Sequence, residues 1–148
     1  MVTFPSLDWF QRLAESMNAN RARQEKLGYV DCVAQFTVRE AGASPWSVQV
    51  TFEEFSAVDV RTVEAGEEER ADFILEMPLD DWRKMIDSIA GGKGRPALQQ
   101  TLNYLSNMGA PLVVRSNDPL RRDLYFRYNQ SLQEFVNASA LFETTYGG

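Results

Sequence analysis

Few side chains in this sequence are suited to acid–base or metal chemistry. Its 148 residues include no histidine, the side chain that proteins use most often as a general base and as a metal ligand. The carboxylate pairs Glu53-Glu54 and Asp80-Asp81 are adjacent in the chain, and adjacent side chains point in different directions on a strand or a helix. Neither pair therefore predicts an acid–base couple. Proton transfer beside an apolar pocket stays open for three side chains: Asp123, Tyr104 and Tyr125.

The cysteine and a glycine-rich segment are also expected to be structural. Cys32 is the single cysteine and lies in a strand-like run, so we interpret it as a buried thiol that no histidine is available to activate. One cysteine cannot form a disulfide within the chain, which is typical of a reducing compartment. Residues 91–94, Gly-Gly-Lys-Gly, follow a predicted helix and not a strand, which indicates a connector rather than a phosphate-binding loop. The sequence predicts a protein that is not an enzyme and that holds no cofactor or metal.

A basic, aromatic run at residues 121–128 is the main candidate for contact with an anion. It contains Arg121, Arg122 and Arg127 beside three aromatic side chains, and arginines at a pocket mouth can bind a carboxylate or a coenzyme A phosphate. Helical spacing, however, puts the three arginines on different faces of a helix. We therefore favour a solvent-exposed helix surface that is paired with local acids.

Charge is unevenly distributed along the chain. The net charge of −6 argues against general binding to nucleic acids or to anionic membrane surfaces. Residues 93–128 hold six cations and two acids, or +4, which leaves −10 for the remainder, densest at residues 64–69. We expect two solvated surfaces on opposite sides of the protein. No apolar run approaches the ~20 residues of a membrane span, and neither end of the sequence resembles a targeting signal, so the expected location is the cytoplasm.

Two helices are expected before the first strand. Ser6 is a good helix cap, and an apolar stripe at helical spacing follows it at Phe10, Leu13 and Met17. A second helix, over residues 21–27, is expected to end at Gly28, because glycine readily adopts the left-handed conformation common at a helix terminus.

Alternating apolar and polar residues predict four strands. The first three runs have their apolar faces at Cys32, Ala34, Phe36 and Val38, at Val48, Val50 and Phe52, and at Val58 and Val60. The fourth run, residues 71–77, places Phe73, Leu75 and Met77 on one face and Asp72 and Glu76 on the other. Because short loops join the runs, we expect an antiparallel meander with one face against the core.

The junction at residues 71–82 is the most specific pattern in the chain. The fourth strand stops at Pro78, which cannot donate to a strand ladder, and Asp80 is placed to cap the helix that follows. The apolar side of that helix is expected at Trp82, Met85, Ile86 and Ile89.

Three further elements are expected after this helix. An amphipathic segment over about residues 95–109 carries Leu98, Leu102, Leu105 and Met108. Residues 111–115 predict a fifth strand, and Asp118-Pro119 begins a long last helix with an apolar face at Leu120, Leu124, Tyr128, Leu132 and Phe135. The order of elements predicts one α+β domain over residues 1–148, with a five-stranded, mostly antiparallel sheet and helices packed mainly on one face.

The junction sequence ADFILEMPLDDW of residues 71–82 resembles that of the sterol carrier protein type 2 (SCP2) family, whose members carry an A-D-F-x-L-x-M…D-D-W pattern. The similarity in element order extends over most of the chain and includes Leu7-Asp8-Trp9 in the first helix. The resemblance implies an SCP2-like fold in which the last helix closes an apolar tunnel over the sheet. The chain departs from the family at residues 112–118, which lack the usual Gly-Asp-rich ending, and at the additional segment 95–109.

The expected function is cytoplasmic binding or transfer of a hydrophobic ligand, such as a fatty acyl, sterol-like or other lipid, in an apolar pocket between sheet and helices. Such a ligand gains about 25 cal/mol for each Å² of apolar surface that it buries, and a few polar groups suffice to orient its head. The expected lining consists of apolar-face residues that a closed core would also need: Phe73, Leu75, Trp82, Met85, Ile86, Leu102, Leu105, Met108, Phe126, Leu132 and Phe135.

Two other functions stay open at this point. One is an interaction or dimerisation module whose core is filled by its own side chains, and the other is an accessory subunit of a catabolic enzyme that acts on hydrophobic substrates. The expected partner is a small hydrophobic ligand, with a homodimer as an open alternative. Neither nucleic acid nor stable insertion into a membrane is expected.

Overall fold

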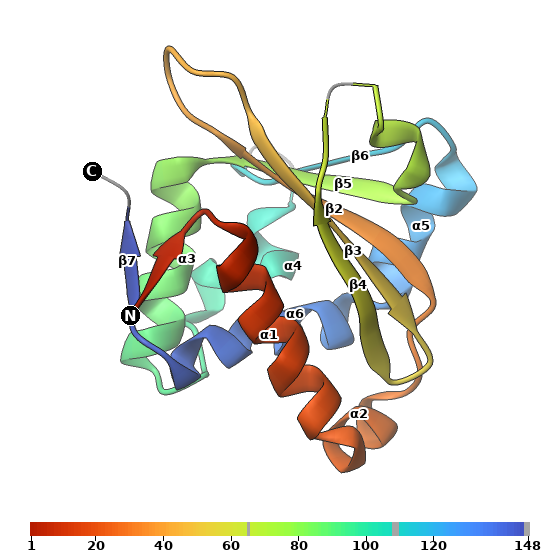
Figure 1. Ribbon diagram of the computed structural model, residues 1–148, viewed down its shortest axis with the longest axis vertical. Coiled ribbons are helices and arrows are strands. Elements are labelled where there is room, and N and C mark those ends of the chain that lie inside the picture. Colours follow the sequence, from red (N-terminus) through yellow and green to blue (C-terminus); the bar gives the residue numbers. More distant parts are fainter. Residues whose placement is uncertain (65, 108–109, 147–148) are drawn as a thin grey trace.

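A five-stranded mixed sheet with the strand order β4-β3-β2-β5-β6 is the centre of the fold (Figure 1). The computed structural model describes residues 1–64, 66–107 and 110–146. β2 pairs with β5 in parallel, and the other three pairings are antiparallel. The predicted α+β class with a five-stranded, mostly antiparallel sheet is confirmed. The strands are β2 (Cys32–Arg39), β3 (Trp46–Glu53), β4 (Ser56–Thr62), β5 (Phe73–Pro78) and β6 (Val113–Arg115).

The fourth predicted strand does not continue a meander, because β5 lies beside β2 and not beside β4. After β4 the chain crosses the face of the sheet opposite the main helices. There the Gln49 side-chain Nε2 donates to the Glu67 carbonyl oxygen at 3.0 Å. The chain then joins β2, where the Asp72 amide donates to the Val33 carbonyl oxygen at 2.8 Å. The expectation of a four-stranded meander was wrong because loop length alone does not select the partner strand.

The register places the apolar residues of neighbouring strands in rows on one face. Phe36 of β2 lies opposite Leu75 of β5 and Val48 of β3, and all three are buried. In β4 the register shifts at a bulge, where Phe52 pairs with Ala57. Ala57 is therefore buried, while Val58 is 51% exposed. The assignment of Val58 to the apolar face was wrong because a bulge inverts the alternation of side chains.

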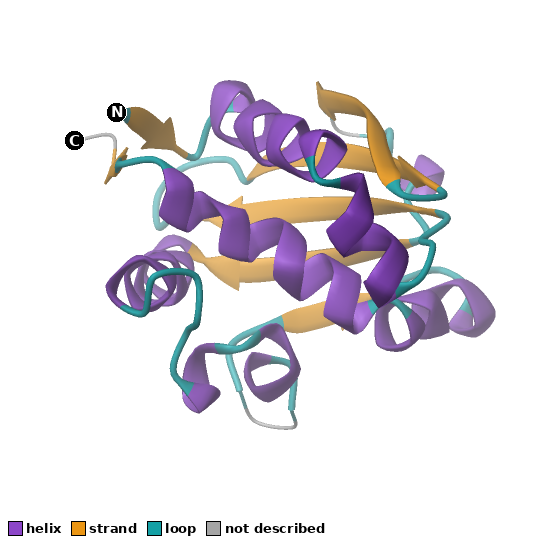
Figure 2. Ribbon diagram, turned by 90° about the horizontal axis from the view of Figure 1, so that it is seen from below, coloured by secondary structure: helices purple, strands orange, loops and turns teal. Residues whose placement is uncertain are grey.

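Three helices cover the inner face of the sheet (Figure 2): α1 (Leu7–Ala19), α3 (Leu79–Gly91) and α6 (Asn129–Asn137). The predicted apolar sides of α1 and α3 are buried in the core. The Trp82 indole also donates to the Thr37 carbonyl oxygen at 3.2 Å, which fixes α3 on β2. The other helices are α2 (Arg21–Leu27), α4 (Leu102–Leu105) and α5 (Pro119–Arg127), with 3₁₀ turns at η1 (Glu68–Arg70), η2 (Leu98–Gln100) and η3 (Ala138–Leu141).

Three of the four predicted helix-end residues are confirmed. The Trp9 amide donates to Ser6 Oγ at 3.1 Å, and the Leu120 amide donates to Asp118 Oδ1 at 2.9 Å. Gly28 ends α2 with φ +97°. Asp80 is not a cap, because α3 begins at Leu79 and its capping position, Pro78, makes no side-chain hydrogen bond. Asp80 instead lies in the first turn, where a negative charge is favourable to the helix dipole.

The last predicted helix is two helices, because the chain leaves helical geometry at Tyr128. The break lets α5 bury Tyr125 while α6 buries Leu132 and Phe135. Leu120, which a continuous helix would have placed on the apolar face, is therefore exposed.

The predicted amphipathic segment 95–109 is also shorter than expected. It consists of η2 and the four residues of α4, because Thr101 between them is extended and its Oγ1 caps α4 by accepting from the Tyr104 amide at 3.3 Å. Met108 lies outside the described residues.

A small parallel sheet joins the two ends of the described chain, and no pattern in the sequence predicts it. Its strands are β1 (Val2–Phe4) and β7 (Thr144–Tyr146). Trp9 packs edge-on against Phe4, with ring centroids 4.7 Å apart, and its indole donates to Thr144 Oγ1 at 3.1 Å. The pair of strands thus closes one end of the aromatic core.

Candidate functional site

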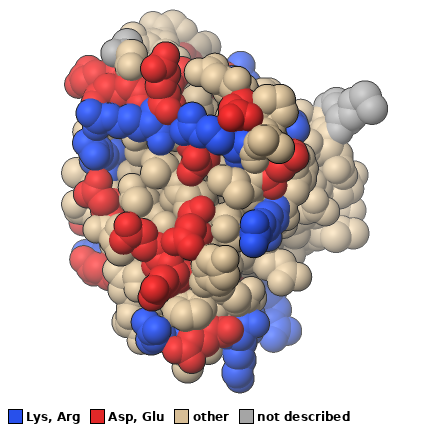
Figure 3. Space-filling view, turned by 90° about the vertical axis from the view of Figure 1, so that its right-hand side faces the viewer, with Lys and Arg blue, Asp and Glu red and all other residues tan. Residues whose placement is uncertain are grey.

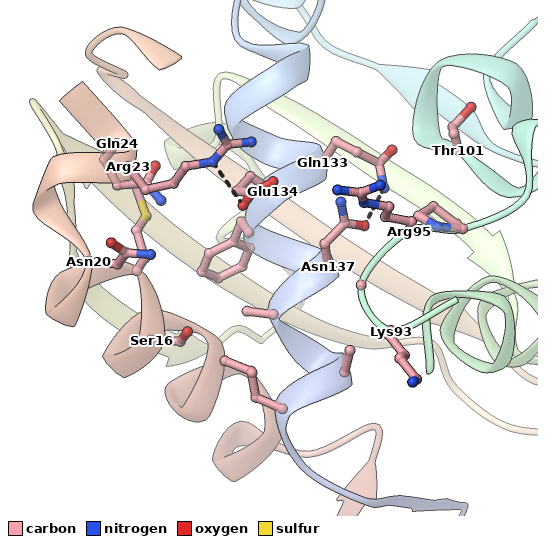
Figure 4. A pocket seen from close by; sticks show the side chains of 17 residues that line it. Ser16, Asn20, Arg23, Gln24, Lys93, Arg95, Thr101, Gln133, Glu134 and Asn137 are labelled. Atoms are coloured by element: carbon pink, nitrogen blue, oxygen red, sulfur yellow. Dashed lines mark hydrogen bonds and ion pairs between the residues drawn. The ribbon is translucent and has the colours of Figure 1, made fainter. Parts of the chain in front are cut away.

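An open groove of about 710 Å³ lies on the helical side of the fold. Residues of α1 and α2 form one wall, the segment from Lys93 to Thr101 forms the other, and α6 runs between them (Figure 4). α6 and η3 form its floor. Because the groove is bounded by three separate stretches of the chain, residues 16–24, 93–101 and 133–141, it depends on the tertiary fold and not on one local motif.

The apolar part of the groove adjoins the hydrophobic core. Met17 of α1 and Phe135 of α6 line it, and both side chains are buried. The Phe135 ring makes a T-shaped contact with Phe52, with centroids 5.1 Å apart, and lies 6.1 Å from the Phe36 ring. Phe135 therefore takes part both in the wall of the groove and in the layer between α6 and the sheet.

Three cations and one carboxylate line the groove. Arg23 Nε lies 3.2 Å from Glu134 Oε1, so these two charges offset each other. Lys93 and Arg95 form no ion pair with any residue that the structure describes. Figure 4 shows them across α6 from Arg23. The groove thus carries a net charge of +2 in a chain whose net charge is −6.

A glycine turn positions the two unpaired cations. A Cβ atom at Gly92 would lie 1.9 Å from the carbonyl oxygen of Arg95, and Gly94 has φ +93°, so both positions require glycine. The Ala97 amide donates to Ser88 Oγ at 2.8 Å, which ties the end of the turn to α3. The glycine-rich connector predicted from the sequence is therefore a compact turn that presents Lys93 and Arg95 to the groove.

Polar side chains in the groove differ in how many of their hydrogen-bonding atoms have a partner. Gln133 accepts from the Leu102 amide at 2.8 Å and donates to Asn137 Oδ1 at 2.8 Å. Gln24 is only 4% exposed, yet its Oε1 has no hydrogen-bond partner within the described part of the chain. An unpaired buried acceptor costs free energy. Gln24 therefore leaves one unsatisfied acceptor enclosed in the wall of the groove.

Nine of the eleven predicted lining residues are at most 4% exposed and belong to the hydrophobic core: Phe73, Leu75, Trp82, Met85, Ile86, Leu102, Leu105, Leu132 and Phe135. Of these, Phe135 also lines the groove. Burial of this kind fits both a closed core and the inner wall of a ligand site. Contact of the nine residues with a ligand therefore stays a prediction.

The other two predicted lining residues are not part of this group. Phe126 is 50% exposed, because α5 turns its neighbour Tyr125 into the core. It lines a separate hollow with Tyr29, and the Arg122 guanidinium lies 5.3 Å from the centroid of its ring. Met108 lies outside the described residues.

The basic run at residues 121–128 is engaged in structural contacts. Arg121 Nε donates to Asp72 Oδ1 at 3.0 Å, and its Nη2 donates to the carbonyl oxygens of Glu69 and Ala71. Arg115 bridges Glu76 and Glu68. Figure 3 accordingly shows basic side chains in a band that acidic side chains border. The expected placement of the two charged regions on opposite sides was wrong, because the acidic segment after β4 crosses the sheet to reach β6 and α5.

The side chains considered for acid–base chemistry differ in burial. The Tyr125 hydroxyl donates to the Leu102 carbonyl oxygen at 3.0 Å, and burial raises its pKa. Burial also raises the pKa of the Cys32 thiol, while Tyr104 and Asp123 are exposed. Residues 1–64, 66–107 and 110–146 contain no group of three or more acidic, cysteine or histidine side chains that is placed to bind a metal. None of the described helices has the length and apolarity needed to cross a membrane.

Sequence reasoning missed the residues that distinguish the groove. Arg23, Gln24, Lys93 and Arg95 belong to segments far apart in the chain, and only the packing of α2, α6 and the glycine turn brings them to one site. The sequence feature that could have pointed to this site is the lysine between glycines at residues 91–94, because a connector does not require a cation at that position.

Comparisons with known proteins identify the fold. No protein-family model matches the chain, and a search of curated proteins found no match. A crystal structure of sterol carrier protein 2 aligns with a TM-score of 0.65 at 18% identity, over 92% of this chain and 96% of that one.

Two further structures align over most of their length. The solution structure of a conserved hypothetical protein from Thermus thermophilus, described as possibly a sterol carrier protein, gives 0.64 at 18% identity over 93% and 88% of the two chains. Apo sterol carrier protein 2 from Yarrowia lipolytica gives 0.52 at 14% identity over 88% of each chain. The predicted SCP2-like fold is confirmed.

Proposed function

We propose that the protein binds a hydrophobic small molecule of the fatty acyl, sterol-like or other lipid class and carries it without changing it chemically. The ligand lies in the groove over α6, with its apolar part against Met17 and Phe135 and its polar end near Lys93 and Arg95. The observation that carries this proposal is the position of Phe135, which lines the groove and also belongs to the hydrophobic layer over the sheet. A fold shared with structures named sterol carrier protein supports the ligand class.

The size and chemistry of the groove support this assignment. Its volume of about 710 Å³ falls within the range of small-molecule sites. Each methylene that leaves water contributes about 0.8 kcal/mol, so a chain of about ten methylenes supplies about 8 kcal/mol before the cost of immobilisation. Rotation of the Phe135 side chain would open the groove toward Leu132 and Leu102. In this proposal the predicted lining residues are the inner wall that the far end of the ligand reaches.

We also propose a cytoplasmic location, which the buried free thiol of Cys32 supports. The absence of histidine from the sequence, the burial of Tyr125 and the exposure of Tyr104 and Asp123 support a carrier over an enzyme. A carrier of this kind releases its ligand chemically unchanged.

Uptake of a fluorescent fatty acid tests the proposal. Delipidated protein is titrated with cis-parinaric acid, and native mass spectrometry of gently purified protein is used to look for a retained lipid. We expect saturable uptake that the variant Ala138→Trp weakens at least tenfold, because Ala138 lines the groove and the indole would fill it. The matched control Ala43→Trp places the same side chain in the exposed β2–β3 turn and should bind like the wild type. Absence of uptake, or equal uptake by both variants, would contradict the proposal.

The alternative of an interaction module with a filled core is favoured by one observation, the complete burial of residues such as Leu75, Met85 and Leu132. A core of this kind is filled by its own side chains and does not require a bound ligand. It predicts that the protein takes up no fatty acid and purifies without one. The same titration therefore separates the two functions.

A further inference from the structure

A smaller hollow of about 420 Å³ lies where α2 ends and α5 meets α6. It is lined by two stretches of the chain, residues 27–29 and residues 126–131. No described residue lines both this hollow and the groove over α6. The hollow is therefore a separate feature of the surface, to which the proposed function assigns no part.

Aromatic side chains line the hollow from both stretches. Tyr29 is 51% exposed and Phe126 is 50% exposed. The Arg122 guanidinium lies 5.3 Å from the centroid of the Phe126 ring, which stabilises the position of this ring. Single exposed hydrophobic residues are common on protein surfaces, but two aromatic residues that line one hollow form a combined apolar surface that a partner can cover.

The polar part of the lining offers hydrogen-bond donors and a positive charge. Arg127 is the one charged side chain among the described residues that line the hollow. It forms no ion pair with a residue that the structure describes, although Asp123 lies one turn earlier on α5. Tyr29 and Gln130, which is also exposed, add a hydroxyl and an amide. The lining is thus complementary to a partner with free carbonyl oxygens and a negative charge.

Three recurring modes of peptide recognition place different demands on such a surface. Strand addition requires the free edge of a strand, and no described residue that lines the hollow belongs to a strand. Helix docking requires aliphatic pockets, whereas Leu27 is the one aliphatic side chain among the described lining residues. A polyproline II segment has no internal hydrogen bonds, so its carbonyl oxygens are free to accept, and its rings pack on aromatic side chains. The third mode matches both the aromatic rings and the donors.

We infer that this hollow binds a proline-rich segment of another protein, and that the segment carries an acidic residue. The proline rings pack on Tyr29 and Phe126, carbonyl oxygens accept from the Tyr29 hydroxyl and the Gln130 amide, and Arg127 pairs with the acid. A polyproline II segment is already extended before it binds, so it loses little conformational entropy. The site joins the proposed carrier to a protein partner, which goes beyond ligand uptake.

Titration of ¹⁵N-labelled full-length protein with a synthetic peptide, followed by amide chemical shifts, tests the inference. The peptide has four prolines on each side of a central aspartate. One control peptide has alternating glycine and serine in place of the prolines, and a second has asparagine in place of the aspartate. We expect saturable shifts at residues 27–29 and 126–131, an affinity about threefold lower for the asparagine peptide, and no saturation with the glycine–serine peptide.

Two pairs of variants test the residues that carry the inference. Phe126→Ala should weaken binding at least about fivefold, because aromatic side chains dominate the energy of such interfaces. Its matched control is Tyr104→Ala, which removes a ring of similar exposure from α4 and should bind like the wild type. Arg127→Gln should abolish the preference for the aspartate peptide, whereas Arg61→Gln, on β4, should retain it. Because these side chains are exposed, thermal unfolding should show all four variants folded at the titration temperature.

The inference is overturned if the glycine–serine peptide binds as well as the proline peptide, if neither saturates, or if Phe126→Ala and Tyr104→Ala bind alike. A dimer in sedimentation velocity that Phe126→Ala dissociates would also overturn it, because a second copy of this chain would then cover the hollow. Uptake of cis-parinaric acid without binding of the proline peptide would refute this inference and leave the proposed function standing.

Discussion

Truncation of Phe135 to alanine tests whether the groove and the hydrophobic layer form one ligand site. The Phe135 ring is buried and contacts Phe36 and Phe52. Removal of a buried phenylalanine costs about 3–5 kcal/mol, a large part of the roughly 5–15 kcal/mol typical of a folded domain. For a chain of this length each kcal/mol lowers Tm by about 3 °C. We therefore expect Phe135→Ala to unfold about 10–15 °C below the wild type.

The same truncation should make the protein more responsive to ligand. Loss of the ring joins the groove to a cavity in the layer beneath it, and an acyl chain can occupy that cavity. Recovered apolar contact then returns about half of the lost free energy, or about 2 kcal/mol. Since a ligand that binds only the native state raises its stability, palmitate should raise the Tm of Phe135→Ala by several degrees more than that of the wild type.

Thermal unfolding with and without saturating palmitate measures both effects. The control is Phe4→Ala, which removes another buried ring that packs on Trp9, with centroids 4.7 Å apart, and that belongs neither to the groove nor to the predicted lining. It should lose comparable stability without the larger ligand response. If palmitate stabilises the two variants equally, or stabilises Phe135→Ala no more than the wild type, the groove does not lead into the layer.

Three smaller predictions concern stability. Arg121→Met should lower the free energy of unfolding by about 1–2 kcal/mol in urea, because it leaves the half-buried Asp72 carboxylate without its arginine; a double-mutant cycle with Asp72→Asn showing no coupling would contradict this. Gly28→Ala should cost about 1 kcal/mol in the same assay, since φ at this position is +97°, and a neutral result would refute the need for glycine. Burial raises the pKa of Cys32 above its unfolded value, so the unfolded thiol ionises near pH ~8.5 while the native thiol stays neutral. The wild type should therefore lose stability relative to Cys32→Ala as the pH rises above this value, and parallel pH profiles would show that the thiol is not protected.

Much of the fold could be predicted because its elements are amphipathic over their full length. The alternation in β2, β3 and β5 and the stripes of α1 and α3 each specify a buried face. The errors in the bounds and faces of single elements fall where a local irregularity interrupts the periodicity. Val58 is displaced by a bulge, Tyr128 breaks a helix whose apolar pattern continues through it, and Thr101 stops a helical segment with its own side chain.

The site was less predictable than the fold, for a physical reason. An apolar pattern shows that Phe135 and Leu132 face inward, but it does not distinguish a core residue from the wall of a ligand site. Gln24 and Arg95 come to line one groove only because α2 and the glycine turn pack around α6. The identity of the strand beside β2 likewise depends on a chain crossing that local sequence does not encode.

The most direct test of the central claim is a titration of ¹⁵N-labelled, delipidated protein with palmitate, followed by amide chemical shifts. We expect saturable shifts that centre on Met17, Gln24, Lys93 and Phe135 and extend inward to Leu132, with the β2–β3 turn unaffected. Shifts confined to another surface, or a spectrum that palmitate leaves unchanged, would show that the groove over α6 is not a ligand site.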